Sequence, residues 1–162
     1  MRRNNLYNPS PKTHQVLVNN VKISNTGSTT ENTIYTGTIH ANSIGVNGSF
    51  HIIGLWSVSN NANAKDIKVK FNGTTVLDIL ALTSVAATHS YTILTNRNSL
   101  SAQVSGNVSS PAANAGFGTN SGSAVSTYTI NTGADITVTV TMTNGNGTDT
   151  VSLEAFQILA VN

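Results

Sequence analysis

The stretch from Ile44 to Leu82 most constrains the fold, because its apolar residues recur at every second position between polar turns. Side chains two residues apart lie on the same face of a β-strand. The first run places Phe50 and Trp56 on one face and Ile53 and Leu55 on the other. We therefore expect a strand whose middle is buried on both sides, with Trp56 packed in the core. The alternative for Trp56 is an exposed platform on which a sugar stacks.

The second run, residues 66–71, alternates without exception between charged residues, expected outside, and apolar residues, expected inside. It ends at Asn72-Gly73, the preferred pair for a two-residue type I′ hairpin turn. Residues 74–82 then return as a largely apolar strand. The whole stretch predicts three consecutive antiparallel strands.

The rest of the chain repeats this pattern, with turn residues spaced roughly ten apart. We predict an all-β, single-domain, jelly-roll-like antiparallel sandwich of eight to ten strands. An immunoglobulin-like sandwich is the alternative, although its Cys–Trp–Cys pattern is absent. Residues 1–14 are predicted to be an extended basic arm, and residues 15–162 the sandwich domain. The further expected strands are 15–24, with a bulge or turn at Asn19-Asn20, then 33–40, 88–96, 99–105, 126–131, 135–142 and 151–161.

Composition limits the classes of partner. Only 9% of residues are charged, against about a quarter in an average domain. The first thirty residues carry four basic and no acidic side chains, and the remainder carries four basic against six acidic ones, which leaves the body at −2. So few basic groups do not favour a nucleic-acid partner. No apolar run reaches the length of a membrane span. The positive N-terminus lacks the apolar core of a signal peptide, so we expect synthesis in a cytoplasm without a cleaved signal.

Motifs for catalysis and metal binding are missing from the sequence. The four histidines are scattered, without ligand spacing, and there is no cysteine. Neither a Gly-x-Ser-x-Gly elbow nor a phosphate-binding glycine loop occurs. We therefore expect no enzyme activity, no metal and no cofactor. A carbohydrate-active or cupin-like enzyme is the least favoured alternative.

Contacts with partners are expected at the weakly patterned parts of the chain. The basic arm is one, and the irregular loop 107–124 with Phe117 is another, although Phe117 could instead anchor that loop on the core. In the last strand the apolar residues change parity after Ala155, so either a bulge shifts the phase or both faces are covered at a subunit interface. The predicted partner-binding residues are Arg2, Arg3, Leu6, Tyr7, Pro9, Pro11, Lys12, Phe117, Phe156 and Ile158.

Residues 38–76 resemble a stretch found in small β-rich virion proteins of tailed bacteriophages. The resemblance covers about a quarter of the chain. It lies in the segments Ile39-His40-Ala41-Asn42, Gly45-Val46-Asn47-Gly48, Leu55-Trp56, Asn60-Asn61-Ala62-Asn63-Ala64-Lys65 and Lys68 to Thr75.

The resemblance implies a jelly-roll capsid decoration (cement) protein or a head or tail fibre domain, without an active site. Under the main hypothesis the chain is a homotrimer on the capsid surface that binds the major capsid protein and stabilises the phage head. Such a protein would be made in the cytoplasm of the host bacterium. Under the alternative it is a receptor-binding or fibre domain that contacts a host surface glycan or protein. Neither hypothesis involves nucleic acid or a membrane.

Overall fold

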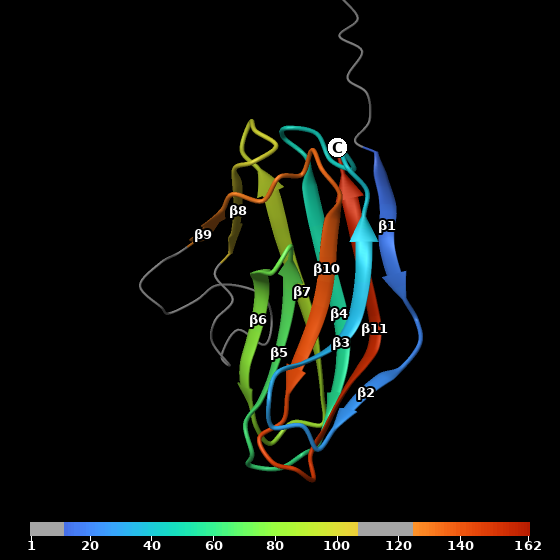
Figure 1. The fold of residues 1–162 in the computed structure, drawn as a ribbon, viewed down its shortest axis with the longest axis vertical. Helices are drawn as coiled ribbons and strands as arrows, with labels where there is room; N and C mark the ends of the chain where they lie inside the picture. Colours follow the sequence, from blue (N-terminus) through green and yellow to red (C-terminus); the bar gives the residue numbers. More distant parts are fainter. Residues whose placement is uncertain (1–11, 107–124) are drawn as a thin grey trace, which may run out of the picture.

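Two antiparallel β-sheets pack face to face in the computed structural model, which describes residues 12–106 and 125–162 (Figure 1). No helix long and apolar enough to span a bilayer occurs among these residues. The strands are β1 (Thr13–Asn19), β2 (Ile23–Thr26), β3 (Asn32–Ile39), β4 (Ser49–Val58), β5 (Lys65–Phe71), β6 (Thr74–Leu82), β7 (Ala87–Asn96), β8 (Gln103–Gly106), β9 (Val125–Tyr128), β10 (Ile136–Thr143) and β11 (Thr150–Val161).

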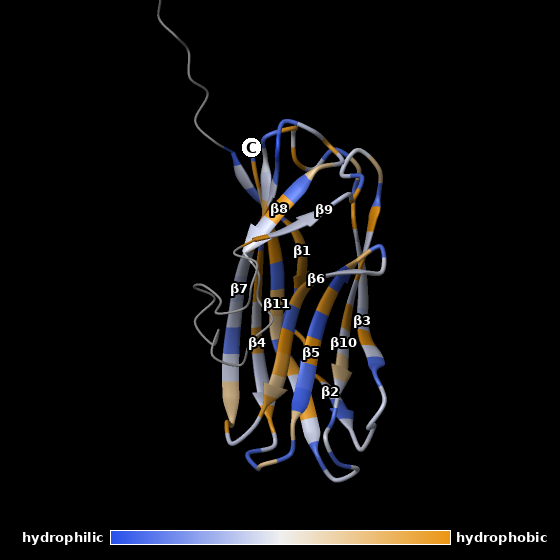
Figure 2. Cartoon of the chain, turned by 90° about the vertical axis from the view of Figure 1, so that its left-hand side faces the viewer, coloured by the Kyte–Doolittle hydropathy of each residue, from blue (hydrophilic) through white to orange (hydrophobic). Residues whose placement is uncertain are grey.

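The strand order is that of a jelly roll, as the sequence predicts. A seven-stranded sheet has the order β1-β11-β4-β7-β8-β9, with β2 also paired to β11; we call it the large sheet. The small sheet has the order β3-β10-β5-β6. Four strands of each sheet therefore make the double layer of a jelly roll. The hairpin of β8 and β9 extends one edge of the large sheet. Figure 2 shows the two layers side by side.

The 44–82 stretch forms three strands, as predicted, but the first of them does not pair with the second. β4 pairs with β7 and β11 in the large sheet, and the chain then crosses to the small sheet before β5 begins. Only β5 and β6 form the expected hairpin, with positive φ at both Asn72 (48°) and Gly73 (81°) as a type I′ turn requires. The alternation of apolar and polar residues indicates which face of a strand is buried. It does not indicate which other strand pairs with it.

The first predicted strand is divided in two. The break falls just after Asn19, as expected, and the Asn19 amide donates to the carbonyl of Val21 at 2.7 Å. Both halves pair with β11. β1 begins at Thr13, which pairs with Val161, so the sandwich starts two residues before the predicted boundary at 14/15. The start of β1 is set by pairing with the end of β11, which is a long-range contact. The local sequence therefore does not predict it.

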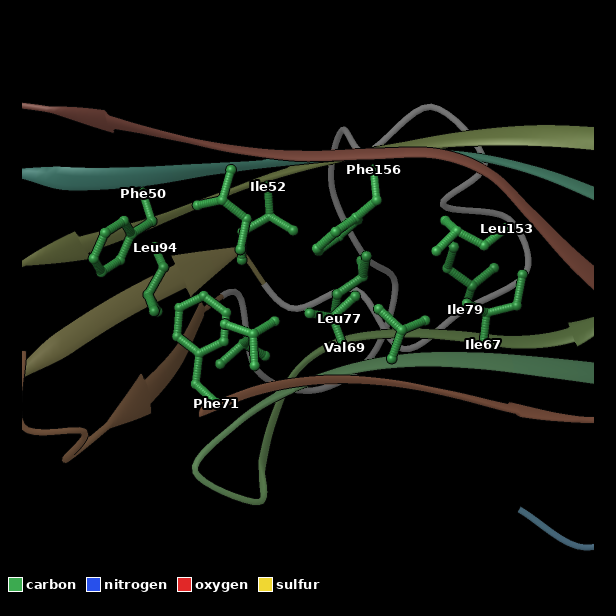
Figure 3. Close-up of a cluster of buried hydrophobic side chains, with 14 of the residues drawn as sticks. Phe50, Ile52, Ile67, Val69, Phe71, Leu77, Ile79, Leu94, Leu153 and Phe156 are labelled. Carbon is green, nitrogen blue, oxygen red and sulfur yellow. The ribbon is translucent and has the colours of Figure 1, made fainter. Parts of the chain in front are cut away.

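The core fills the space between the sheets (Figure 3). Trp56 is fully buried, as predicted, and its indole N–H donates to Ser90 Oγ at 3.0 Å. Phe50 from the large sheet meets Phe71 from the small sheet edge to face, with ring centroids 5.8 Å apart. The inward residues predicted for β10 are all buried: Ile136, Val138, Val140 and Met142.

Gly54 makes room for the indole. A Cβ placed on Gly54 would lie 2.3 Å from Cζ2 of Trp56, which is far inside van der Waals contact. Trp56 itself is enclosed by the core, so it has little space into which to move. The glycine is therefore needed for its lack of a side chain.

We predict that Gly54→Ala lowers the free energy of unfolding by about 1–3 kcal/mol, the usual cost of overpacking a core. The matched control is Gly106→Ala in β8, where an added Cβ meets nothing within 4 Å. Denaturant unfolding followed by Trp56 fluorescence measures both variants. Equal stability of the two variants would contradict the proposed steric role.

Charged side chains gather on the small sheet. Lys70 and Lys68 both contact the Glu31 carboxylate, Lys68 at 3.7 Å, and the hydrogen bond from Lys70 is the main reason that the pKa of Glu31 is lowered. Asp78 is different, because its buried Oδ1 has no hydrogen-bond partner. Burial raises the pKa of Asp78. The two carboxyl groups should therefore influence stability in opposite directions.

We predict that Asp78→Asn becomes more stable relative to wild type as the pH rises from about 4 towards neutrality. A raised folded pKa means that ionisation of Asp78 destabilises the fold, and asparagine removes that ionisation. Glu31→Gln is the control, because its stability relative to wild type should change with pH in the opposite direction. Its lowered folded pKa stabilises the wild type above the unfolded pKa, and this advantage is lost as the pH falls through the folded pKa. Thermal unfolding from about pH 3 to neutrality measures the stability of each variant relative to wild type. The assignment is refuted if neither relative stability changes with pH.

Candidate functional site

The outer face of the large sheet is almost free of charge. Its seven strands contain one charged residue, Glu154, whose carboxylate binds Lys22 at 2.9 Å and accepts a hydrogen bond from Ser57. The hydrogen bond from Lys22 is the main cause that lowers the pKa of Glu154. The four strands of the small sheet contain five charged residues: Lys65, Asp66, Lys68, Lys70 and Asp78. A partner that met the large sheet would therefore face a neutral surface.

We define the large-sheet outer face by the side chains of β11, β4 and β7 that alternate with the buried ones. Leu55 is 47% exposed and Ile93 38% exposed, while Ile53 is half-buried. The expectation that the middle of β4 is buried on both sides is therefore wrong for Leu55. Cross-strand pairing arranges this face in three rows: Ala155–Leu55–His89, Gln157–Ile53–Tyr91 and Leu159–His51–Ile93.

A shallow groove of about 240 Å³ crosses this face. It lies beside the point where the register of β11 against β4 shifts, between Leu153 and Ala155. A bulge bends its strand locally, and here the outward residue beside the shift, Ala155, has only a methyl side chain. The result is a depression with taller side chains around it. The groove is lined by Asn20, Ile53, Gly54, Leu55, His89, Ala155, Phe156 and Gln157.

Polar side chains at the large-sheet outer face form hydrogen bonds with one another. A hydrogen bond of 2.8 Å joins the Tyr91 hydroxyl to His51 Nδ1, and the two rings meet edge to face with centroids 5.7 Å apart. The Gln15 side-chain nitrogen Nε2 donates to the Gln157 side-chain oxygen Oε1 at 3.1 Å. The other donors and acceptors of these two amides can serve a ligand. The face therefore combines aromatic rings, aliphatic groups and neutral hydrogen-bonding groups.

A second groove, of about 420 Å³, lies between the β5–β6 turn and the β8–β9 hairpin. Its central polar residue, Gln103, is already used by the fold. The Gln103 amide donates to Asn96 at 2.8 Å and accepts from the Ile130 N–H at 2.9 Å. Arg97 is the charged residue in its lining, which also includes Thr74, Ala102, Thr127, Tyr128 and Thr129.

The predicted partner-binding residues fall into three groups. Lys12 is exposed next to β1, and its carbonyl accepts the Asn162 N–H at 3.1 Å. Phe156 and Ile158 are 1% and 0% exposed, so their predicted role in partner binding is wrong. The register shift at Glu154 turns both side chains inward. Of the two alternatives for the last strand, this is the bulge and not the subunit interface. Outside the described residues lie Arg2, Arg3, Leu6, Tyr7, Pro9, Pro11 and Phe117.

Sequence reasoning missed the large-sheet outer face. The available signal was that the runs 49–58 and 87–96 contain no charged residue on either parity. The apolar residues on both faces of β4 favour burial on both sides instead. The sugar-stacking alternative for Trp56 is excluded, because the indole is fully buried.

Groups of three or more metal-ligating side chains do not occur within residues 12–106 and 125–162. The expectation that the chain is not an enzyme stays a prediction.

Comparisons with known proteins give little further guidance. No protein-family model and no curated protein matches this chain. Among solved structures, it is similar to the CBM2 module of the evolved Dit of Lactobacillus casei BL23 phage J-1. The identity is 11%, the TM-score is 0.42, and the match covers 94% of this chain and 97% of the other. At this level the likeness supports no conclusion about function.

Proposed function

We propose that this chain is a non-catalytic module of a tailed-phage virion that binds a neutral glycan on the host surface through the large-sheet outer face. The observation that carries the proposal is the distribution of charge. Seven strands contribute one charged residue to the large sheet, and that residue is paired with Lys22. The virion context rests on the resemblance of residues 38–76 to small phage proteins.

A neutral sugar suits this chemistry. One side of a pyranose ring presents C–H groups that pack on aromatic and aliphatic side chains, while its hydroxyls both donate and accept hydrogen bonds. Tyr91 and Leu55 offer such packing surfaces, and His89 and Gln157 flank them with polar groups. Charged groups would bring a desolvation cost that a neutral ligand does not repay.

The face is also held in shape before a ligand arrives. The Tyr91–His51 hydrogen bond fixes two rings on neighbouring strands, and the strands themselves lie in the middle of the large sheet. A rigid surface loses little conformational entropy on binding, so weak contacts with a sugar are not cancelled by ordering.

A second candidate function is capsid cement: a homotrimer that binds the major capsid protein. It is favoured by the aliphatic residues at the surface of the large sheet, since contiguous apolar surface marks protein contacts. These residues are Val18, Leu55, Ile93 and Val125, each between 38% and 48% exposed. Particles that lack the protein should then lose resistance to heat and to internal DNA pressure. Equal resistance would reject this candidate.

We predict that the purified protein binds neutral saccharides on an array of bacterial surface polysaccharides. Tyr91→Ala and His89→Ala should each weaken that binding roughly tenfold, or about 1.4 kcal/mol. Tyr91→Phe keeps the ring but loses the hydrogen bond to His51, so it should weaken binding less than Tyr91→Ala does. Titration calorimetry with the best saccharide gives the dissociation constants.

The matched control is Thr36→Ala, an exposed threonine on β3 in the small sheet. It should leave saccharide binding unchanged. Failure to bind any neutral saccharide, or an equal loss in the control variant, would overturn the glycan proposal. Binding to purified capsids instead would favour the cement candidate.

A further inference from the structure

A buried polar cluster lies at the end of the sandwich where the β4–β5 and β10–β11 loops meet. It consists of Asn61 and Asn63 in the first loop, Lys65 at the start of β5 and Asp149 just before β11. Lys65 is 0% exposed and Asp149 1% exposed. Lys65 shares the parity of Ile67 and the other inward residues of β5, so strand geometry directs its side chain into the protein.

The contacts bring an amine, a carboxamide and a carboxylate together. Lys65 Nζ donates to the Asn61 side-chain oxygen at 2.5 Å and to the Asn63 carbonyl at 2.8 Å. Asp149 Oδ1 accepts from the Asn61 side-chain nitrogen at 2.6 Å and from that of Asn63 at 3.4 Å. The other carboxylate oxygen, Oδ2, is 4.0 Å from Lys65 Nζ and has no hydrogen-bond partner.

These are the groups that an amide-forming reaction needs. A lysine amine becomes nucleophilic when it loses a proton in a desolvated site. Asp149 is the proton acceptor that the geometry offers, because its unpartnered oxygen Oδ2 lies 4.0 Å from Lys65 Nζ. The hydrogen bond from Asn61 is the main cause that lowers the pKa of Asp149, which keeps it a carboxylate before the reaction. The same carboxylate touches the Asn61 nitrogen, which would be the leaving group. Hydrogen bonds hold the three groups together, and the surrounding protein shields Lys65 and Asp149 from water.

We propose that Lys65 and Asn61 condense into an intramolecular isopeptide bond, with Asp149 as the group that transfers the proton.

The reaction balances without a further reactant. The Lys65 ammonium gives one proton to Asp149, and Nζ attacks Asn61 Cγ to form the new C–N bond. The bond between Cγ and Nδ2 then breaks, and Nδ2 takes one proton and leaves as ammonia. Nζ loses two protons in all: one leaves with the ammonia, and the other stays on Asp149 as a neutral carboxylic acid.

The product removes two buried charges. A buried ion pair carries a desolvation penalty that its mutual attraction offsets only with good geometry, and here the charged atoms are 4.0 Å apart. An amide and a neutral acid avoid that penalty. The link would also close the β4–β5 loop, to which the β6–β7 loop is tied by a hydrogen bond from Ser84 N–H to the Asn61 carbonyl at 2.7 Å.

The β10–β11 loop also packs tightly against this region. A Cβ on Gly145 would lie 2.3 Å from the Ala64 carbonyl oxygen, so no side chain fits between the two loops. The arrangement therefore holds Asn61 and Lys65 in place from more than one side. This inference is independent of the proposed glycan binding.

The test is the mass of the purified, full-length wild-type protein. An isopeptide bond lowers the intact mass by about 17 Da, the mass of one ammonia. Trypsin would then fail to cut after Lys65, and tandem mass spectrometry would find residues 23–68 as one peptide joined internally at Asn61 and Lys65. The joined residues must be identified as well as the loss of mass. A succinimide at an Asn-Gly pair loses the same mass but leaves the chain cleavable after Lys65.

Variants test the assigned roles. Lys65→Met should keep the full mass, whereas Lys68→Arg, on the outer side of the same strand, should still lose ammonia. Asp149→Asn should fold, by circular dichroism, but keep the full mass and be cut after Lys65. A wild-type protein of full mass that trypsin cuts after Lys65 would overturn the proposal, whatever the variants do. Cross-linking in Asp149→Asn would overturn the role of Asp149.

Discussion

The pairing of β11 with β4, together with its single register shift, determines most of what the molecule can present. Glu154 is the extra residue at that shift, and the residues after it change sides. Phe156 therefore enters the core, where its ring lies 6.3 Å from that of Trp56. Ala155 moves to the outside, where its small side chain leaves room for the groove. One bulge thus completes the core and shapes the outer surface.

Alternation in the sequence was sufficient to predict the fold class and the buried faces. Phe50, Trp56 and Val138 follow the period of two and are buried as expected. Pairing was harder, because both partners of β4 come much later in the chain: β7 begins at Ala87 and β11 at Thr150. The choice between a bulge and an interface in β11 also depended on that distant partner.

The candidate face was missed for a different reason. Leu55 and Ile93 look like core residues in any local pattern, yet they point to solvent. Hydrophobicity alone does not distinguish a second buried side from an apolar surface kept for a partner. Lys65 is the reverse case, a charged residue at an inward position. Its parity with Ile67 was visible in the sequence, but the buried carboxylate of Asp149 became evident only from the tertiary structure.

The exposed apolar residues and the buried polar cluster both depart from simple alternation of polar and apolar residues. They lie in different parts of the sandwich. The exposed apolar residues lie on the open face of the large sheet, where they do not disturb the core, and a rigid sheet supports them. The buried polar cluster lies among the loops, where few backbone ladders exist and side chains must hold the chain together. A local link there would fix the loops without stiffening the face. The proposed recognition surface and the proposed link therefore lie apart, so that changes in one need not alter the other.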